Sequence, residues 1–306
     1  MAENIKQLKQ KIKSVKSLQK ITKAMEMIAR AKMKKSINDA LLTRTYATLA
    51  LELLVNISYD IFHKNVFLDA RSEEGKILVI YIASDKGLCG GYNTQILKAA
   101  KKYFSSHHYK DEKVEYVTIG KYAEIHARKL PGKILQSFGD FKEVNSFSGG
   151  KKIYDFILSE YATRKYKKAL IIYTNYLSVF SREPAVRELL PVSEKSLKNM
   201  IEHLGGVEDD IKIRSLKDRG FKRYLYEPSP ETVLDLIVPE LVSIQIFQSI
   251  LESRASEESG RMVAMKSASE NGEKIGKELE ITYNRARQAA ITKEIIEISS
   301  AAEAIS

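Results

Sequence analysis

The sequence predicts an α/β protein in which long N- and C-terminal helices pair as an antiparallel coiled coil, with an α/β domain inserted between them. Three observations predict this fold. Residues 1–74 contain no Gly and no Pro, so nothing interrupts a helix there. No proline follows Pro239 in the last part of the chain. Between these ends, short β-branched runs alternate with helical patterns, which is the order of a parallel, Rossmann-like sheet.

The N-terminal helix is expected from about residue 3 to residue 58, a length of about 80 Å at 1.5 Å per residue. Its apolar residues recur at steps of three and four, from Ile5 to Val15 and again from Leu18 to Ile28. We interpret the jump of three between these runs as one stammer in a single heptad stripe that faces a partner helix. A helix this long must pair with another helix or project into another protein.

The C-terminal helix is expected from about residue 232 to residue 304, with a kink near Pro239. Glycines inside a helix cost about 1 kcal/mol each relative to Ala, so Gly260, Gly272 and Gly276 predict the close approach of another backbone. Residues 1–40 carry a net charge of +8 and residues 230–306 a net charge of −5, which favours antiparallel pairing of the two helices. The predicted apolar stripe is Leu234, Ile237, Leu241, Ile244, Phe247, Leu251, Ala255, Met262, Met265, Ala268, Ile275 and Leu279.

The central domain is expected at residues 75–228, between helical segments 1–60 and 230–306. Continuous β-branched runs indicate strands buried on both faces. The expected strands are 76–83, 112–119, 133–138 and 168–173, with weaker candidates at 186–191, 211–214 and 221–226. The expected helices are 93–104, 121–129 and 149–163.

The motif search predicts no catalytic, cofactor-binding or metal-ligating residue. The loop Ser84–Asn93 follows the first strand, where phosphate-binding loops lie, but it matches neither G-x-G-x-x-G nor G-x-x-x-x-G-K-[ST]. A tight strand-to-helix turn is the favoured interpretation. The single cysteine, Cys89, excludes an intrachain disulfide and is expected to be a small buried hydrophobe. Of the histidines, His107 and His108 are expected at a helix end and the others on the surface.

Membrane spanning is not expected, because the longest charge-free stretches, 169–181 and 241–251, are shorter than the roughly 20 residues that a transmembrane helix needs. Two other classes of function stay open on the residues alone. A basic N-terminal helix is also typical of a nucleic-acid-binding coiled coil, but that leaves the acidic C-terminal helix unexplained. An α/β enzyme with helical oligomerisation arms has no catalytic residues to name.

Five blocks of sequence, in order along nearly the whole chain, resemble the gamma subunit of F-type ATP synthases. The blocks are Gln19–Met27 with Ala31–Met33, Ser84–Asn93, Tyr224–Pro228, Arg261–Lys266 and Tyr283–Glu294.

This resemblance implies the central stalk, or rotor, of the enzyme, present in one copy per complex. Its partners are then the alpha and beta subunits of the catalytic hexamer, the epsilon subunit and the membrane c-ring, with no nucleic acid and no cofactor. The resemblance further implies that catalysis belongs to the beta subunits. It places the chain peripherally at the cytoplasmic face of the cell membrane, where it couples ion flow to ATP synthesis and regulates ATPase activity and proton flow.

The resemblance also suggests contact residues. Met25, Arg287, Gln288 and Thr292 are expected to contact the beta subunits, and Tyr224 and Glu227 the membrane ring. Two plainer interpretations stay open: Met25 as one more position of the coiled-coil stripe, and Tyr224 with Glu227 as an ordinary strand end before a proline turn.

Overall fold

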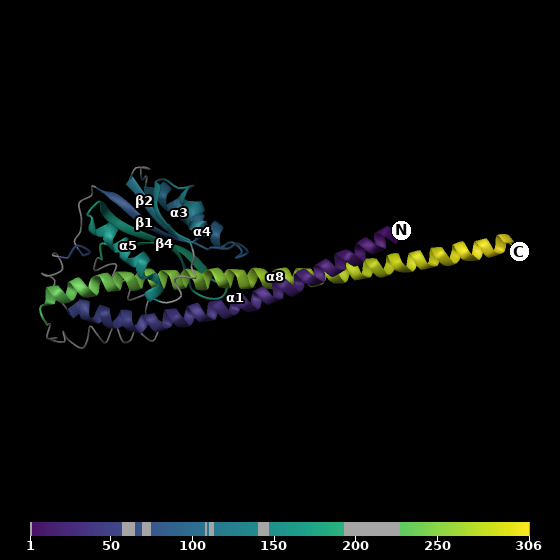
Figure 1. Ribbon diagram of the computed structural model, residues 1–306, viewed down its shortest axis with the longest axis horizontal. Helices are drawn as coiled ribbons and strands as arrows, with labels where there is room; N and C mark the ends of the chain where they lie inside the picture. The colour runs from purple at the N-terminus through teal and green to yellow at the C-terminus, as the bar shows by residue number, and fades with distance from the viewer. Residues whose placement is uncertain are drawn as a thin grey trace. The chain divides into compact units, whose positions relative to one another are not determined.

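The computed structural model describes the backbone of residues 2–56, 65–68, 75–107, 109, 113–139, 147–192 and 227–305 (Figure 1). The chain divides into two compact units, one formed by residues 1–31 with 261–306 and the other by residues 32–260. Two long helices, α1 (Ala2–Asn56) and α8 (Pro230–Ile305), each contribute to both units. The two predicted terminal helices are therefore confirmed to within two residues at each end. The predicted division at 1–60, 75–228 and 230–306 stays a prediction.

The unit of residues 32–260 contains a five-stranded sheet in the order β3-β2-β1-β4-β5. The three pairs among β1, β2, β3 and β4 are parallel, and the fourth pair, between β4 and β5, is antiparallel. The reason is the short turn at 177–181, since only antiparallel strands can be joined by a hairpin. The predicted strands at 211–214 and 221–226 lie outside the described residues. The strands are β1 Lys76–Ile82, β2 Val114–Ile119, β3 Lys133–Phe138, β4 Tyr166–Tyr176 and β5 Arg182–Leu190.

Helices cover both faces of this sheet, as the predicted alternation requires. Helices α3 (Tyr92–His107) and α4 (Lys121–Ala127) pack on one face, and α5 (Lys151–Ala162) packs on the other (Figure 1). Strand β1 is buried on both sides, because its alternate residues belong to two separate hydrophobic clusters. A strand buried on both faces reads as a continuous apolar run, which is why the sequence located it.

The first part of α8 belongs to the sheet's core. Leu234, Leu241, Phe247 and Leu251 are buried in the same hydrophobic cluster as β1 and α5. The sheet and α5 cover this part of the stripe, which was expected to pair with the N-terminal helix, and Ala40 of α1 packs against the same cluster. Burying such side chains stabilises the fold by about 1.5–3 kcal/mol each. By length and composition α8 is also apolar enough to cross a membrane, but 61% of its most apolar window is buried within the protein, which a core helix also shows.

Helix α8 begins with a capped first turn. The Ser229 hydroxyl accepts a hydrogen bond from the Thr232 N–H at 3.2 Å, which satisfies one main-chain donor of the first turn. Pro230 follows at the first helical position, where its missing N–H costs nothing. The helix then continues through Pro239.

Glu115 and His126 are titratable residues that are buried in the α/β domain. Glu115 of β2 bonds Lys76 at 2.7 Å, and Lys133 and Tyr166 as well. Burial alone would raise the pKa of Glu115, but these hydrogen bonds outweigh it and lower the pKa to about 2. His126 of α4, expected on the surface, is buried, with its Nδ1 3.1 Å from the Tyr81 hydroxyl. Its burial lowers its pKa to about 4.

Candidate functional site

The unit formed by residues 1–31 and 261–306 is an antiparallel helix pair. A Cβ at Gly272 would lie 3.6 Å from the Gln19 Cβ, and one at Gly276 would lie 3.8 Å from Val15 Cγ1. Residue numbers fall on α8 as they rise on α1, so the predicted antiparallel pairing is confirmed. The predicted close approach of another backbone is not seen at Gly276, where the contact is with a side chain, and at Gly272 the nearest backbone atom, the Gln19 Cα, lies 4.0 Å from such a Cβ. Lys16 and Glu280 form an ion pair across the helices at 2.6 Å, but both are exposed, so it contributes at most about 1 kcal/mol.

The seam of α1, meaning the residues that face α8, follows an unbroken heptad. Steps of three and four continue from Val15 to Gln19 and onward, without the predicted stammer, which is therefore wrong. The heptad geometry persists through polar residues because the opposing residues of α8, such as Ser269 and Gly272, are small enough for close packing. The seam residues, all buried or half-buried, are Ile5, Leu8, Ile12, Val15, Gln19, Thr22, Glu26 and Ala29.

The opposing seam of α8 is also regular. Ile275 was predicted to belong to it, but the structure leaves Ile275 exposed and buries Gly276 instead. A seam that contains glycine and serine contributes little apolar area and lets the two backbones approach closely. Its residues are Met262, Met265, Ser269, Gly272, Gly276, Leu279, Tyr283, Ala286 and Ala290.

The second apolar run of α1 forms an exposed stripe on one flank of the seam. Leu18, Ile21 and Ile28 are 60%, 54% and 56% exposed, and Met25 is half-buried between them and the seam. Successive members are three or four residues apart, so they line one side of the helix. A contiguous exposed apolar surface marks an interaction site. The jump of three in the sequence was the signal of this second face, although we interpreted it as a stammer in one stripe.

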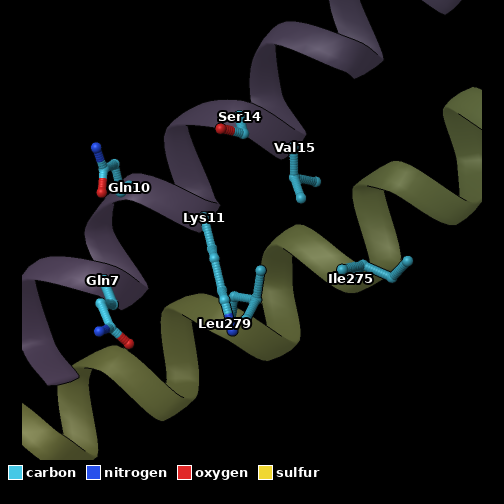
Figure 2. Close-up of a pocket in the computed structure, with 7 residues that line it drawn as sticks. All are labelled: Gln7, Gln10, Lys11, Ser14, Val15, Ile275 and Leu279. Carbon is cyan, nitrogen blue, oxygen red and sulfur yellow. The ribbon is translucent and has the colours of Figure 1, made fainter.

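The same flank continues toward the N-terminus as an open groove of about 590 Å³ between α1 and α8. Figure 2 shows its side chains, with Lys11 extending from α1 toward Leu279 of α8. Val15, Ile275 and Leu279 supply apolar surface, while the remaining lining residues of α1 are polar. These are Gln7, Gln10, Lys11 and Ser14.

The opposite flank of α1 is basic. Its side chains recur at steps of three and four and are exposed, whereas the buried Glu26 receives Lys23 at 3.0 Å and Arg30 at 3.7 Å. Helix geometry at 100° per residue places this ladder and the apolar stripe on either side of the seam. The helix pair thus offers a partner one basic and one apolar face. The ladder consists of Lys6, Lys9, Lys13, Lys16, Lys20, Lys23 and Arg30.

The last turns of α8 extend past the N-terminal end of α1 (Figure 1). Thr292 lies in this extension, whereas Arg287 and Gln288 lie level with the first turn of α1, and all three are exposed. The exposed isoleucines Ile291, Ile295 and Ile298 add an apolar stripe.

The predicted contact residues do not form one cluster. Because Gln19 lies opposite Gly272, Met25 lies opposite a point of α8 that precedes Arg287 by about 20 residues. That separation corresponds to about 30 Å along the helix. Glu227 is exposed just before α8, and Tyr224 lies outside the described residues.

The loop Ser84–Asn93 is a tight turn whose polar side chains bond one another. The Ser84 hydroxyl lies 2.9 Å from Asn93 Oδ1, and Asn93 Nδ2 lies 3.4 Å from the Cys89 sulfur. Cys89 is buried, as predicted. Gly90 and Leu88 adopt positive φ values of 62° and 63°, which form the turn. Within the described ranges, no cluster of three His, Cys, Asp or Glu side chains could hold a metal ion.

Comparison with known proteins agrees with this architecture. A family model described as ATP synthase matches residues 4–305. The ATP synthase gamma chain of Prosthecochloris aestuarii is 35% identical over 305 residues, covering 98% of each chain. That of Akkermansia muciniphila is 33% identical over 302 residues, covering 99% of each.

Solved structures share the fold. A chain of the Euglena gracilis mitochondrial ATP synthase OSCP/F1/c-ring structure aligns with a TM-score of 0.63 at 20% identity, covering 100% of this chain and 95% of that one. A chain of the central stalk/c-ring structure from Tetrahymena thermophila aligns with a TM-score of 0.53 at 21% identity, covering 81% and 99%. With a family model that matches residues 4–305 and relatives about 35% identical over 98% of the chain, this chain belongs to the ATP synthase gamma chain family.

Proposed function

We propose that this gamma chain is the non-catalytic rotor of its ATP synthase, one copy turning inside a hexamer of alpha and beta subunits. It couples ion flow through the membrane c-ring to ATP synthesis or hydrolysis at the beta subunits, and so regulates ATPase activity and proton flow. The observation that carries this proposal is the exposed apolar stripe of Leu18, Ile21 and Ile28. A helix that already has a partner along its seam does not need this stripe for pairing, so the stripe is available to a surrounding subunit.

An asymmetric shaft inside equivalent catalytic subunits cannot contact all of them alike. Each beta subunit is therefore biased toward a different conformation. Switching one site from 1:99 to 99:1 takes a differential of about 5.5 kcal/mol, which many small contacts along the helix pair can supply together. Binding linkage is reciprocal, so rotation driven by ions releases ATP, and hydrolysis drives rotation backward.

We assign contacts with the beta subunits to two positions along the length of the helix pair. Met25 is half-buried beside the apolar stripe, and a flexible thioether side chain can slide over a changing surface. Arg287, Gln288 and Thr292 are exposed on the last turns of α8. The Arg287 guanidinium offers five donors in a planar fork to carbonyls or carboxylates, and Gln288 and Thr292 share one face of the helix at i and i+4.

Contacts with the membrane ring are assigned to Tyr224 and Glu227, with the epsilon subunit beside the central domain. These assignments place the chain at the cytoplasmic face of the cell membrane as a peripheral protein. An exposed carboxylate such as Glu227 can accept hydrogen bonds from ring-loop amides or basic side chains.

Replacing Tyr224 and Glu227 by Ala should lower ion pumping per ATP while the ATPase of the soluble sector stays intact. Unchanged pumping would remove this assignment.

The rotor proposal is tested by replacing Leu18, Ile21 and Ile28 together by Ser and reconstituting the chain with alpha and beta subunits. Steady ATP hydrolysis by the complex should fall several-fold, whereas the isolated chain hydrolyses no ATP in either form. Met27→Ser is the matched control, because Met27 is 59% exposed on the same helix but lies on the basic flank. Equal losses in the two variants, or hydrolysis by the isolated chain, would contradict the proposal.

A further inference from the structure

The carboxyl edge of the sheet is where α/β domains of this topology bind ligands. In open parallel sheets the ligand crevice opens where the strand order reverses. Here β2 lies on one side of β1 and β4 on the other, so the reversal falls between the carboxyl ends of β1 and β4. The loop Ser84–Asn93 follows β1 at this point, and residues 174–181 end β4 and form the hairpin turn.

In this protein α8 occupies that crevice. The Ser253 hydroxyl accepts a hydrogen bond from the Thr174 N–H at 3.1 Å, and the Ser256 hydroxyl donates to the Thr174 carbonyl at 3.2 Å. The Ser259 hydroxyl donates to the Val179 carbonyl in the hairpin turn. All three serines are fully buried. Their spacing of three residues places them along one side of the helix.

The position of Thr174 explains why it needs these partners. Strand β1 ends at Ile82, and its last pairing with β4 joins Tyr81 to Ile172. Thr174 therefore lies beyond the end of β1, and buried main-chain groups there must find hydrogen-bond partners elsewhere. Serines of α8 supply both a donor and an acceptor at this point.

Gly260 brings α8 against the other side of the crevice. A Cβ at this position would lie 2.5 Å from the Cys89 carbonyl oxygen and 2.8 Å from Arg182 Nη1. Only a glycine allows the helix to come this close to the loop after β1. Strand β4 and the loop after β1 are thus both in direct contact with one short segment of α8.

These contacts differ in kind from the rest of the packing between α8 and the sheet. The preceding residues, 234–251, contribute apolar side chains to the core, and apolar contacts have no preferred direction. Hydrogen bonds to the main chain are directional and fix the helix in both rotation and translation. Other buried serines of α8 do not act in this way: Ser243 and Ser249 donate to carbonyls of their own helix, Pro239 and Gln245, at 2.9 Å each.

We propose that Ser253, Ser256, Ser259 and Gly260 are positioning residues for rotation. They form a joint that fixes the α/β domain to α8, so that turning the domain turns the helix. The crevice in which this fold binds ligands is thus occupied here by a helix of the same chain. This proposal rests on the proposed function in one respect, namely that the domain receives torque from the membrane ring.

The test uses the assembled complex of alpha, beta and gamma subunits, held through its beta subunits. A gold rod is attached to the α/β domain through a cysteine that replaces Lys101, which is exposed on α3. The angular variance of the rod during pauses between ATP-binding events measures the stiffness of the joint. In the variant with Ser253, Ser256 and Ser259 replaced by Ala, we expect the variance to rise at least two-fold, with unloaded ATP hydrolysis unchanged. In the complete membrane enzyme, ion pumping per ATP should fall.

Two control variants separate the joint from ordinary packing. Ser249→Ala removes a buried hydroxyl that donates within its own helix, and Ile157→Val lowers the stability of the α5 core. Both should keep the parent's angular variance, even where the melting temperature falls. Should the triple variant not assemble, Ser256→Ala alone decides, with a smaller rise expected.

The proposal of a joint would be overturned if the angular variance of the triple variant equalled the parent's, or if Ser249→Ala raised the variance by the same amount. Because the variance is measured without the ring, a rise in variance with unchanged pumping per ATP would support the joint and overturn only the assignment of ring torque to the domain.

Discussion

At the scale of single residues, the glycines of α8 show that one residue type serves two different contacts. Gly272 and Gly276 face α1 at ordinary van der Waals distance, while Gly260 is pressed against a carbonyl group of the α/β domain. The sequence predicted the close approach of a backbone at all three. It could not show which backbone, because spacing along one helix does not identify its neighbours. Substitution by Ala separates the two cases.

Gly272→Ala should stabilise the protein and Gly260→Ala should destabilise it. At Gly272 the nearest atom, the Gln19 Cβ, lies 3.6 Å from the new methyl group, so Ala fits and gains about 1 kcal/mol of helix propensity. At Gly260 the new Cβ would meet the Cys89 carbonyl at 2.5 Å, and overpacking of this kind costs about 1–3 kcal/mol. Denaturant midpoints of the full chain measure both effects. A loss of stability in Gly272→Ala would contradict the helix pairing described above.

His126 should make the protein less stable as the pH falls from about 6.5 to about 4. Burial lowers its folded pKa to about 4 from an ordinary value of 6.5, with a smaller effect from Lys129. The unfolded chain therefore binds the proton first, and stability is lost across this window at about 1.4 kcal/mol per pKa unit. The total is roughly 3 kcal/mol. Glu115 acts in a lower range of pH: its folded pKa is about 2 against an ordinary value of 4.5, so its stabilising contribution is lost as the pH falls from about 4.5 to about 2.

The measurement is the urea unfolding free energy of the parent and of His126→Gln between pH 7 and pH 4. Gln keeps a hydrogen-bonding group near the Tyr81 hydroxyl but does not titrate. The difference between the two proteins should therefore change across the window. Parallel curves would show that His126 is not the group responsible.

At the scale of elements, the spacing of apolar residues predicted which segments are helices and strands, but it did not predict which elements pack against one another. The strand at 76–82 was located because a sheet covered on both faces requires strands with continuous apolar runs, and the helices after it were located by their helical spacing of apolar residues. The direction of β5 was missed, because the length of its turn determines it rather than its own residues. The apolar residues Leu234–Leu251 were assigned to the N-terminal helix, whereas the sheet covers them as well, since a sheet and a helix can both cover an apolar stripe. The exposed stripe was predicted to belong to the seam for the same reason. The spacing of Leu18 and Ile21 fits a seam, and only their exposure in the structure distinguishes the two.

The corrected register of α1 predicts opposite results for two isoleucines. Ile12 is half-buried in the seam and Ile21 is 54% exposed on the stripe. Ile12→Ser should lower the free energy of unfolding by about 1–3 kcal/mol, because it removes packed apolar area. Ile21→Ser should change it by less than about 0.5 kcal/mol, as exposed substitutions do. Guanidinium unfolding followed by circular dichroism measures both. Under the stammered register both variants would lose comparable stability, so equal losses would restore that interpretation.

At the scale of the whole molecule, stability and function are assigned to different faces of the same helices. The seam and the sheet core hold the chain together, and the flanks of α1 and the end of α8 are available to partners. The basic ladder and the apolar stripe lie on either side of one seam, so a surrounding ring of subunits meets a different chemistry at each rotational angle. That asymmetry is what a rotor needs in order to place equivalent catalytic sites in different states. The central domain contributes stiffness if α8 is fixed in its crevice.

Met25 is the residue at which this division is most easily tested. It lies half-buried between the seam and the exposed stripe, so a lysine there would direct its long side chain outward and keep its charge on the surface of the helix pair. A new charged hydrogen bond contributes about 1.5–3 kcal/mol. If the lysine pairs with an acidic loop of a beta subunit, the rotor is held at one angle. Met25→Lys should then lower the efficiency of coupling between ion flow and ATP synthesis and raise the activation energy of steady hydrolysis.

Met25→Leu is the matched control, because it keeps an apolar side chain of similar volume and should leave coupling unchanged. Unfolding of the isolated chain distinguishes a contact from a packing effect. If Met25→Lys weakens coupling in the complex but leaves the stability of the free chain within about 0.5 kcal/mol of the parent, the charge acts on the partner. If instead the free chain loses stability and the assembled complex couples as efficiently as the parent, Met25 belongs to the seam, and the contact with the beta subunit is withdrawn.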